Sequence, residues 1–91
     1  MGKNEINYSC PCCGYLTLSD PFRGSFEICP VCNWEDDPVQ LADPELQGGA
    51  NEQSLNEARQ NFKVFKASAR KYIDDVRDPL NSEVPLKDET D

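Results

Sequence analysis

The chain has 91 residues, five cysteines and a formal net charge of −8. A chain of this length holds one small domain, and its apolar core is only marginally stable without a metal or disulfide staple. The acidic charge balance excludes nucleic acid and anionic membranes as favourable partners, because the surface cannot neutralise phosphates, and it predicts a basic protein partner.

The cysteines are expected to work in a reducing compartment. The first residues lack the apolar core of a signal peptide, and no apolar run approaches the roughly 20 residues that cross a bilayer. We therefore expect a cytoplasmic protein without membrane contact. In the cytoplasm, paired cysteines indicate metal binding or redox chemistry rather than disulfides.

The first third of the chain predicts a short antiparallel sheet. Residues 1–5 are expected to be flexible. Within residues 6–34, apolar and polar residues alternate in three short stretches, which favours two or three strands. Proline and glycine within residues 20–25 predict a turn that joins two of these strands. Residues 35–53 are acidic and rich in turn residues, with no sustained period, and they predict an ordered connecting loop.

A helical region is predicted over residues 54–77. Ser54 and Glu57 form a capping box at its start. The apolar residues then follow at steps of three and four, which predicts one stripe that packs on the sheet. The stripe comprises Leu55, Ala58, Phe62, Phe65, Ala69, Tyr72 and Val76. Residues 81–91 have no period and are expected to be disordered.

The cysteines lie in two segments that repeat one pattern. Residues 10–15 read CPCCGY and residues 29–34 read CPVCNW, and we call them the first and second knuckles. Two residues between thiolates let a tight turn hold one ion, and proline suits the position after the first thiolate. Gly14 and Asn33 tolerate positive φ, so each loop is expected to fold back with its amides aimed at the sulfurs.

The repeat predicts a four-cysteine metal site. Fifteen residues separate Cys13 from Cys29, a spacing typical of zinc ribbons. A closed four-thiolate site leaves no position for substrate, so its zinc is expected to be structural, and iron remains the alternative metal. Four thiolates and one divalent ion would lower the net charge to about −10. The predicted ligands are Cys10, Cys13, Cys29 and Cys32.

Cys12 takes the place of Val31 in this repeat. It is therefore interpreted as a small, mostly apolar side chain, in preference to a reactive thiol or an alternative ligand. The whole pattern predicts a small α+β fold, in which zinc-ribbon or rubredoxin-like knuckles and a short sheet precede a helical region. One domain is expected over residues 6–80, with the ribbon at 6–34.

The sequence contains no histidine. This removes the usual general base, the Cys–His nucleophile and the histidine-containing catalytic zinc sites, so no enzymatic activity is expected. The carboxylates that follow the second knuckle are interpreted first as a solvated turn and second as a contact for a basic partner. The candidate contact set is Glu35, Asp36, Asp37, Asp43 and Glu45.

The chain resembles the cysteine-rich CPCC proteins, a bacterial family of unassigned function named after the motif at residues 10–13. The likeness extends to residues 26–32, 34–37, 48–51 and 54–62, and covers roughly residues 8–80. Many members have glycine near Lys66, which would divide the helical region into two helices. Because nothing at residues 65–68 forces a break here, one helix and two helices both remain open.

The resemblance also implies two functions. Genes of this family resemble genes that lie next to toxin loci. This resemblance implies a zinc-binding immunity or inhibitor protein for a basic bacterial toxin. The knuckles are also similar to those of rubredoxins, which implies electron transfer by iron as the alternative. The chain departs from rubredoxins in its shorter spacer, in Asn33 where they have glycine, and in its long helical region.

Overall fold

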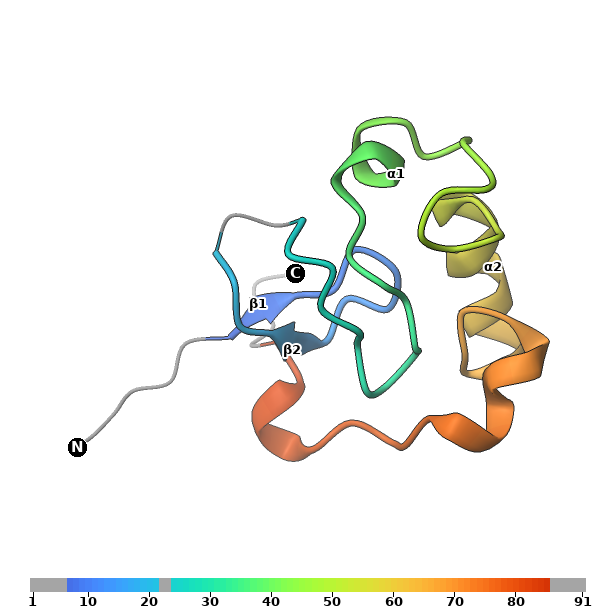
Figure 1. Ribbon diagram of the computed structural model, residues 1–91. Coiled ribbons are helices and arrows are strands. Elements are labelled where there is room, and N and C mark those ends of the chain that lie inside the picture. The colour runs from blue at the N-terminus through green and yellow to red at the C-terminus, as the bar shows by residue number, and fades with distance from the viewer. Residues whose placement is uncertain (1–6, 22–23, 86–91) are drawn as a thin grey trace, which may run out of the picture.

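A computed structural model describes residues 7–21 and 24–85 (Figure 1). A two-stranded antiparallel sheet lies near the cysteine cluster and helices follow it, which confirms the predicted fold class. No helix among the described residues is both long and apolar enough to cross a membrane. The elements are β1 (Tyr8–Ser9), β2 (Leu16–Leu18), α1 (Pro38–Ala42), α2 (Leu55–Phe65) and two 3-10 helices, η1 (Arg70–Asp75) and η2 (Asn81–Glu83).

Each knuckle sits in the bend of a hairpin. The first knuckle connects β1 to β2, in which Tyr8 pairs with Leu18. The second knuckle lies inside a single bridge between Ile28 and Glu35. A third strand is absent from the described residues because Phe26 has φ of 63°, which is outside the extended region. The predicted turn at residues 20–25 lies partly outside the described residues.

The loop at residues 35–53 contains a helix, α1, which the sequence analysis missed. Asp37 caps it, since its Oδ1 accepts from the N–H groups of Val39 at 2.8 Å and Gln40 at 3.4 Å. Pro38 occupies the first turn, where a missing N–H is harmless. An Asp-Pro pair is a helix-start signal, but five residues are too few to show a helical period.

Gln40 orders the rest of this loop from a fully buried position. Its Nε2 lies within 3.1 Å of the carbonyls of Leu46, Asn51 and Gln53, and its Oε1 accepts from the Asn51 backbone and side chain. A Cβ on Gly49 would lie 2.6 Å from Asp37 Oδ2 and 2.8 Å from Gln40 Cδ. The loop therefore closes only around glycine at this position.

The capping box at the start of α2 is confirmed. Ser54 Oγ accepts from the Glu57 N–H at 3.1 Å, and Glu57 Oε1 accepts from the Ser54 N–H at 2.9 Å. Leu55 and Ala58 are buried, and Phe62 packs against the core. The first half of the predicted stripe thus faces the knuckles.

The helical region is divided in two at Lys66. This residue has φ of 64° and its N–H donates to the Phe62 carbonyl, which ends α2. The next two residues, Ala67 and Ser68, are fully buried, and the Ser68 N–H donates to the Cys32 carbonyl at 2.7 Å. The helix ends at this point because the residues that follow it pack and hydrogen-bond against the second knuckle.

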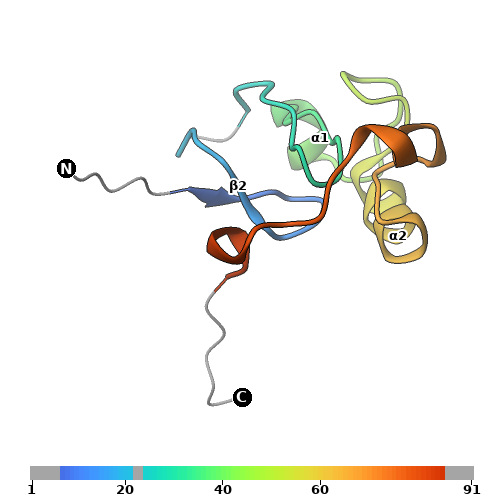
Figure 2. The ribbon, with the colours of Figure 1, turned by 90° about the horizontal axis from the view of Figure 1, so that it is seen from below.

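The C-terminal segment runs from η1 back to the sheet (Figures 1 and 2). The expectation of disorder over residues 81–91 is wrong for residues 81–83, which form η2 against β2. Glu83 is buried there because it pairs with Arg77. Residues 86–91, like residues 1–5, lie outside the described residues.

Candidate metal centre

The hydrophobic core is built around the cysteines. Four of the nine residues in the buried cluster are cysteines, and Trp34 is the largest of the others. A core of this size excludes little apolar surface from water, so the sulfurs must contribute to stability through more than packing. The cluster comprises Cys10, Cys12, Leu18, Cys29, Val31, Cys32, Trp34, Leu55 and Ala58.

The structure brings together the four cysteines that the repeat singled out. Their Sγ atoms all lie within 4.8 Å of one another. The Cys10–Cys32 and Cys13–Cys29 Sγ pairs are 3.6 and 3.7 Å apart. A tetrahedral metal with sulfur ligands at about 2.3 Å has sulfur–sulfur edges of about 3.8 Å. The thiols are free, and their spacing fits one ion that joins the two knuckles.

The two knuckles have the same hydrogen bonds. The Gly14 and Asn33 N–H groups donate to the Cys10 and Cys29 carbonyls at 2.8 and 2.7 Å. Their φ values are 84° and 69°, so both adopt the positive φ that the repeat predicted. The amides that reach sulfur belong to Cys12 and Val31, two residues before the turn residues, because the N–H groups of the turn residues donate to carbonyls.

Three polar groups approach the sulfurs. The N–H groups of Cys12 and Val31 lie 3.4 Å from Cys10 Sγ and Cys29 Sγ. Thr17 Oγ1 lies 3.0 Å from Cys29 Sγ. Thr17 comes from β2 and was not predicted, since its position follows only from the hairpin that places β2 beside the second knuckle. Such donors stabilise thiolates and reduce the negative charge of a four-thiolate site.

The cluster needs a cation to ionise fully. Hydrogen bonds from Cys10, Cys13 and Cys32 hold the pKa of the Cys29 thiol well below its ordinary value. Contact with Cys13 raises the pKa of Cys10, and contact with Cys10 raises the pKa of Cys32. One thiolate is therefore favoured by its neighbours, whereas further ionisation requires a positive charge among the sulfurs. A divalent metal supplies that charge, so the donor set fits a metal chemically as well as geometrically.

A family model described as Cysteine-rich CPCC matches residues 8–83. The chain belongs to the cysteine-rich CPCC family. No curated protein matches the sequence.

Cys12, the second cysteine of the CPCC motif, is not part of the four-sulfur group. It is 8% exposed, and Val31, its counterpart in the second knuckle, is 1% exposed. Both residues belong to the core and both donate a backbone N–H to the preceding ligand cysteine. The repeat therefore placed Cys12 correctly as a buried packing residue.

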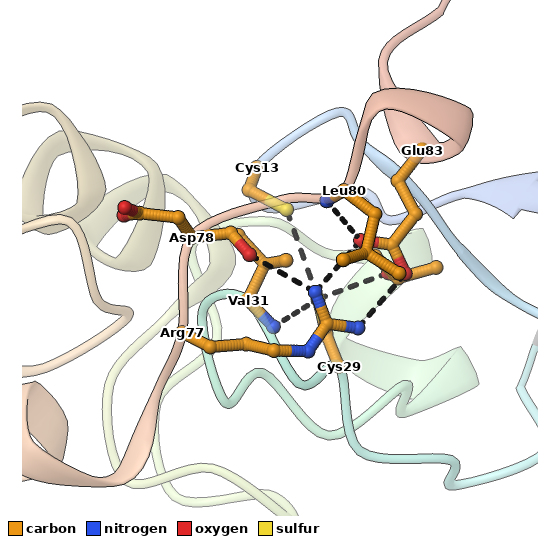
Figure 3. A network of polar contacts seen from close by, with 8 residues as sticks. Cys13, Cys29, Val31, Arg77, Asp78, Leu80 and Glu83 are labelled. Carbon is orange, nitrogen blue, oxygen red and sulfur yellow. Dashed lines mark hydrogen bonds and ion pairs between the residues drawn. The ribbon is translucent and has the colours of Figure 1, made fainter.

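A strap from the C-terminal segment covers the second knuckle, and we define it as residues 76–85. Its backbone is attached by the Arg77 N–H, which donates to the Pro30 carbonyl at 3.2 Å. The Arg77 guanidinium binds both oxygens of Glu83 at 2.9 Å, and the Leu80 N–H also donates to Glu83 at 2.9 Å (Figure 3). The hydrogen bonds with Glu83 raise the pKa of Arg77, and the negative charge of Cys29 adds to that shift.

The strap ends beside the first knuckle. Val84 and Pro85 line one hollow together with Cys13, Gly14 and Tyr15. Cys13 is the one half-buried ligand of the four, whereas the other three are buried. The strap therefore lies next to the most accessible sulfur of the centre.

The acidic contact set is only partly on the surface. Asp36 is fully buried and accepts from the Gly24 N–H at 2.7 Å. Asp37 is 5% exposed, and besides capping α1 it accepts from the Ala50 N–H at 2.9 Å. Burial disfavours the Asp37 carboxylate, but the N–H groups of Ala50 and of α1 outweigh it and lower the pKa of Asp37.

The assignment of Asp36 and Asp37 to a solvated turn or partner contact is therefore wrong, because both carboxylates satisfy backbone amides inside the loop. Asp43 and Glu45 are exposed, and Glu35 is half-buried. These last three remain available to a partner.

Several motifs that carry the family resemblance thus have a structural role. Asn51 accepts from the Glu35 N–H and donates to the Glu35 carbonyl, both at 2.9 Å. Together with Asp37 and Gly49, it fastens the loop beside the second knuckle. These residues stabilise the fold that presents the cysteines.

Proposed function

We propose that the protein is a non-enzymatic, zinc-stabilised binding protein. The observation that carries this proposal is the closed cluster of four sulfurs at the centre of the core. Cys10, Cys13, Cys29 and Cys32 would hold the ion, and a zinc ion bound there supplies folding energy rather than a catalytic position. Thr17 and two backbone amides support the thiolates from outside the ligand set.

The proposed partner is a basic protein. From residue 7 to residue 58 the sequence has one cation, Arg23, which lies outside the described residues, so carboxylates dominate the charge of the sheet and the loop. Asp43, Glu45 and Glu35 replace the wider contact set, since their side chains reach the surface. Such a surface accelerates association with a positively charged protein.

A secreted toxin such as a nuclease is the class of basic protein that we favour, with this chain as its immunity or inhibitor protein. Inhibition of this kind needs a rigid, charged surface and no chemistry of its own. The metal centre and the Gln40 network supply that rigidity on either side of the acidic loop.

The test has two stages. Purified protein is expected to contain one zinc per chain, to be colourless, and to unfold when a strong chelator removes the metal. A red, iron-containing protein with reversible one-electron chemistry would instead favour the rubredoxin-like alternative. Affinity capture from the native host is then expected to recover a basic protein.

Binding to that protein is expected to weaken with added salt and after Asp43→Lys with Glu45→Lys, at unchanged zinc content. Recovery of no basic protein, or of one whose binding ignores both salt and these substitutions, would contradict the partner.

A further inference from the structure

The positive charge of the described chain is confined to one stretch. The described residues between 7 and 58 include no lysine or arginine, although they hold many of the carboxylates, and Arg23 lies outside the described residues. The positively charged residues lie between residues 59 and 77, on α2 and η1 or just after them, and these two helices contact each other. Among the described residues, positive charge is therefore concentrated in one part of the chain. The cations are Arg59, Lys63, Lys66, Arg70, Lys71 and Arg77.

Most of these cations are not neutralised within the chain. Among the described residues, ion pairs join Lys71 to Glu52 and Arg77 to Glu83, and no other is found. Arg59 donates to the neutral oxygens of Pro11 and Asn56. Arg70 lies over the Phe65 ring, 4.5 Å from its centroid. Because carboxylates outnumber cations in this protein, unpaired cations in one part of the chain are not explained by a shortage of partners.

Three of the unpaired cations lie on α2 or at its end, beside an aromatic residue. Arg59 and Lys63 are four residues apart on α2, and Lys66 is the left-handed residue that ends the helix. The three form one row because Phe62 shares one hollow with Arg59 and Lys63 and another with Lys66. Phe62 lies in the same row and is half-buried. The row therefore combines positive charge with apolar surface, and we call Arg59, Phe62, Lys63 and Lys66 the basic row.

Two hollows flank the basic row and meet at Phe62. One, of about 430 Å³, lies against the first knuckle and is bordered by Arg59 and Lys63. The other, of about 450 Å³, has Lys66, Arg77 and Asp78 as its charged lining and apolar walls from Tyr15, Phe65 and Ile73. Tyr15 and Phe62 pack edge to face with ring centroids 6.3 Å apart. The surface can thus accept an apolar side chain between cations.

We propose that the basic row and its two hollows bind an acidic protein segment that carries an aromatic or large aliphatic side chain. The row supplies charges to the carboxylates of the segment, and the aromatic wall supplies a pocket for its apolar side chain. A long polyanion fits less well, because double-stranded DNA carries one charge per about 1.7 Å and would extend beyond the row onto the acidic remainder. This surface is distinct from the acidic loop of the proposed function, and the inference does not depend on it.

The strongest competing explanation assigns the cations to the metal centre. A four-thiolate site with one divalent ion has a net charge of −2, and Arg59 and Lys63 lie beside Cys12 and Cys13 in one hollow. If the cations only offset that charge, then removing one would loosen the metal and leave peptide binding unaffected. Measuring metal retention and binding in the same variants separates these roles.

The test uses the full-length, zinc-loaded protein and a fluorescein-labelled peptide in which phenylalanine alternates with glutamate. Lys63→Glu is compared with Lys71→Glu, which changes the net charge equally but lies off the basic row and breaks an exposed ion pair. We expect Lys63→Glu to raise Kd by about tenfold or more, and Lys71→Glu by less than about twofold. Zinc content is expected to stay at one per chain in both variants. Replacing the phenylalanines of the peptide by serine is expected to weaken binding by about fivefold or more.

Four results would overturn the inference. The first is absence of peptide binding. The second is an equal rise in Kd for Lys63→Glu and Lys71→Glu, which would show that binding depends on net charge alone. The third is loss of zinc from Lys63→Glu, which would assign the cation to the metal centre. The fourth is a different ligand on the basic row. Tighter binding of an oligonucleotide of equal charge would indicate nucleic acid, and self-association that Lys63→Glu abolishes would indicate a second copy of the chain.

Discussion

The attachment of the strap is expected to control how fast the centre loses its metal. Glu83→Gln keeps the length and shape of the side chain and removes its charge. In the native protein this carboxylate accepts from Nη1 and Nη2 of Arg77 and from the Leu80 N–H. The amide can accept at only one oxygen, so the two-pronged pair is lost while packing is retained.

The size of the effect follows from the exposure of the two partners. The Glu83 side chain is 8% exposed and the Arg77 side chain is 42% exposed. Hydrogen bonds to charged groups contribute about 1.5–3 kcal/mol, and solvent around Arg77 reduces that contribution. We therefore expect the closed strap to lose about 1–2 kcal/mol relative to an open one, which raises the open fraction about 5- to 30-fold.

The assay is zinc transfer to a chromogenic chelator present in excess, which reports the first-order release rate. If release requires an open strap, then Glu83→Gln should accelerate it by a similar factor at unchanged zinc stoichiometry. Lys71→Met is the control, since it removes an ion pair whose side chains are 52% and 81% exposed. Equal release rates in Glu83→Gln and the native protein, or the same acceleration in Lys71→Met, would refute the role of the strap.

Four further predictions test the centre and the fold. Cys12→Val should leave zinc content unchanged by metal analysis and alter the free energy of unfolding by less than about 1.5 kcal/mol; loss of zinc would show that Cys12 is a ligand. Asn33→Gly should retain zinc during dialysis against chelator, whereas Gly14→Val should lose it, because φ of 84° strains a β-branched residue. Lys66→Gly should raise the free energy of unfolding by urea by about 1 kcal/mol, since glycine adopts φ of 64° without strain; an unchanged value would contradict strain at Lys66. The pKa of Asp37 is lowered in the folded chain, so its stabilisation is present above about pH 4 and is lost below that; urea unfolding should show a smaller loss between pH 6 and 3 in Asp37→Asn than in the native protein.

The centre could be predicted because its geometry is encoded locally. Within each knuckle, the turn and the sulfur–amide contact join residues no more than four apart, so a repeated pattern fixes a repeated shape. The capping box of α2 is local for the same reason. Thr17 lies beyond this range, since its contact with Cys29 depends on how one hairpin packs against the other.

The acidic loop was misread because its carboxylates are satisfied by distant amides. Asp37 accepts from Ala50, which is 13 residues away, and Asp36 accepts from Gly24, which is 12 residues away. Nothing in a run of acidic residues distinguishes a solvated turn from carboxylates that organise a buried loop. The deciding residue is Gln40, whose burial depends on contacts up to 13 residues away.

The end of α2 is connected to the candidate metal centre by a backbone hydrogen bond. The sequence offers no glycine to end this helix, and a non-glycine residue in the left-handed region costs about 1–2 kcal/mol. The contacts of the next two residues offset that cost. Ala67 and Ser68 become fully buried, and the Ser68 N–H binds the carbonyl of Cys32, a predicted metal ligand. Because the second knuckle must be folded to offer that carbonyl, the break at Lys66 and the strap beyond it both depend on the centre. The second knuckle therefore holds residues 66–85 at two points, through the Ser68 N–H on the Cys32 carbonyl and the Arg77 N–H on the Pro30 carbonyl.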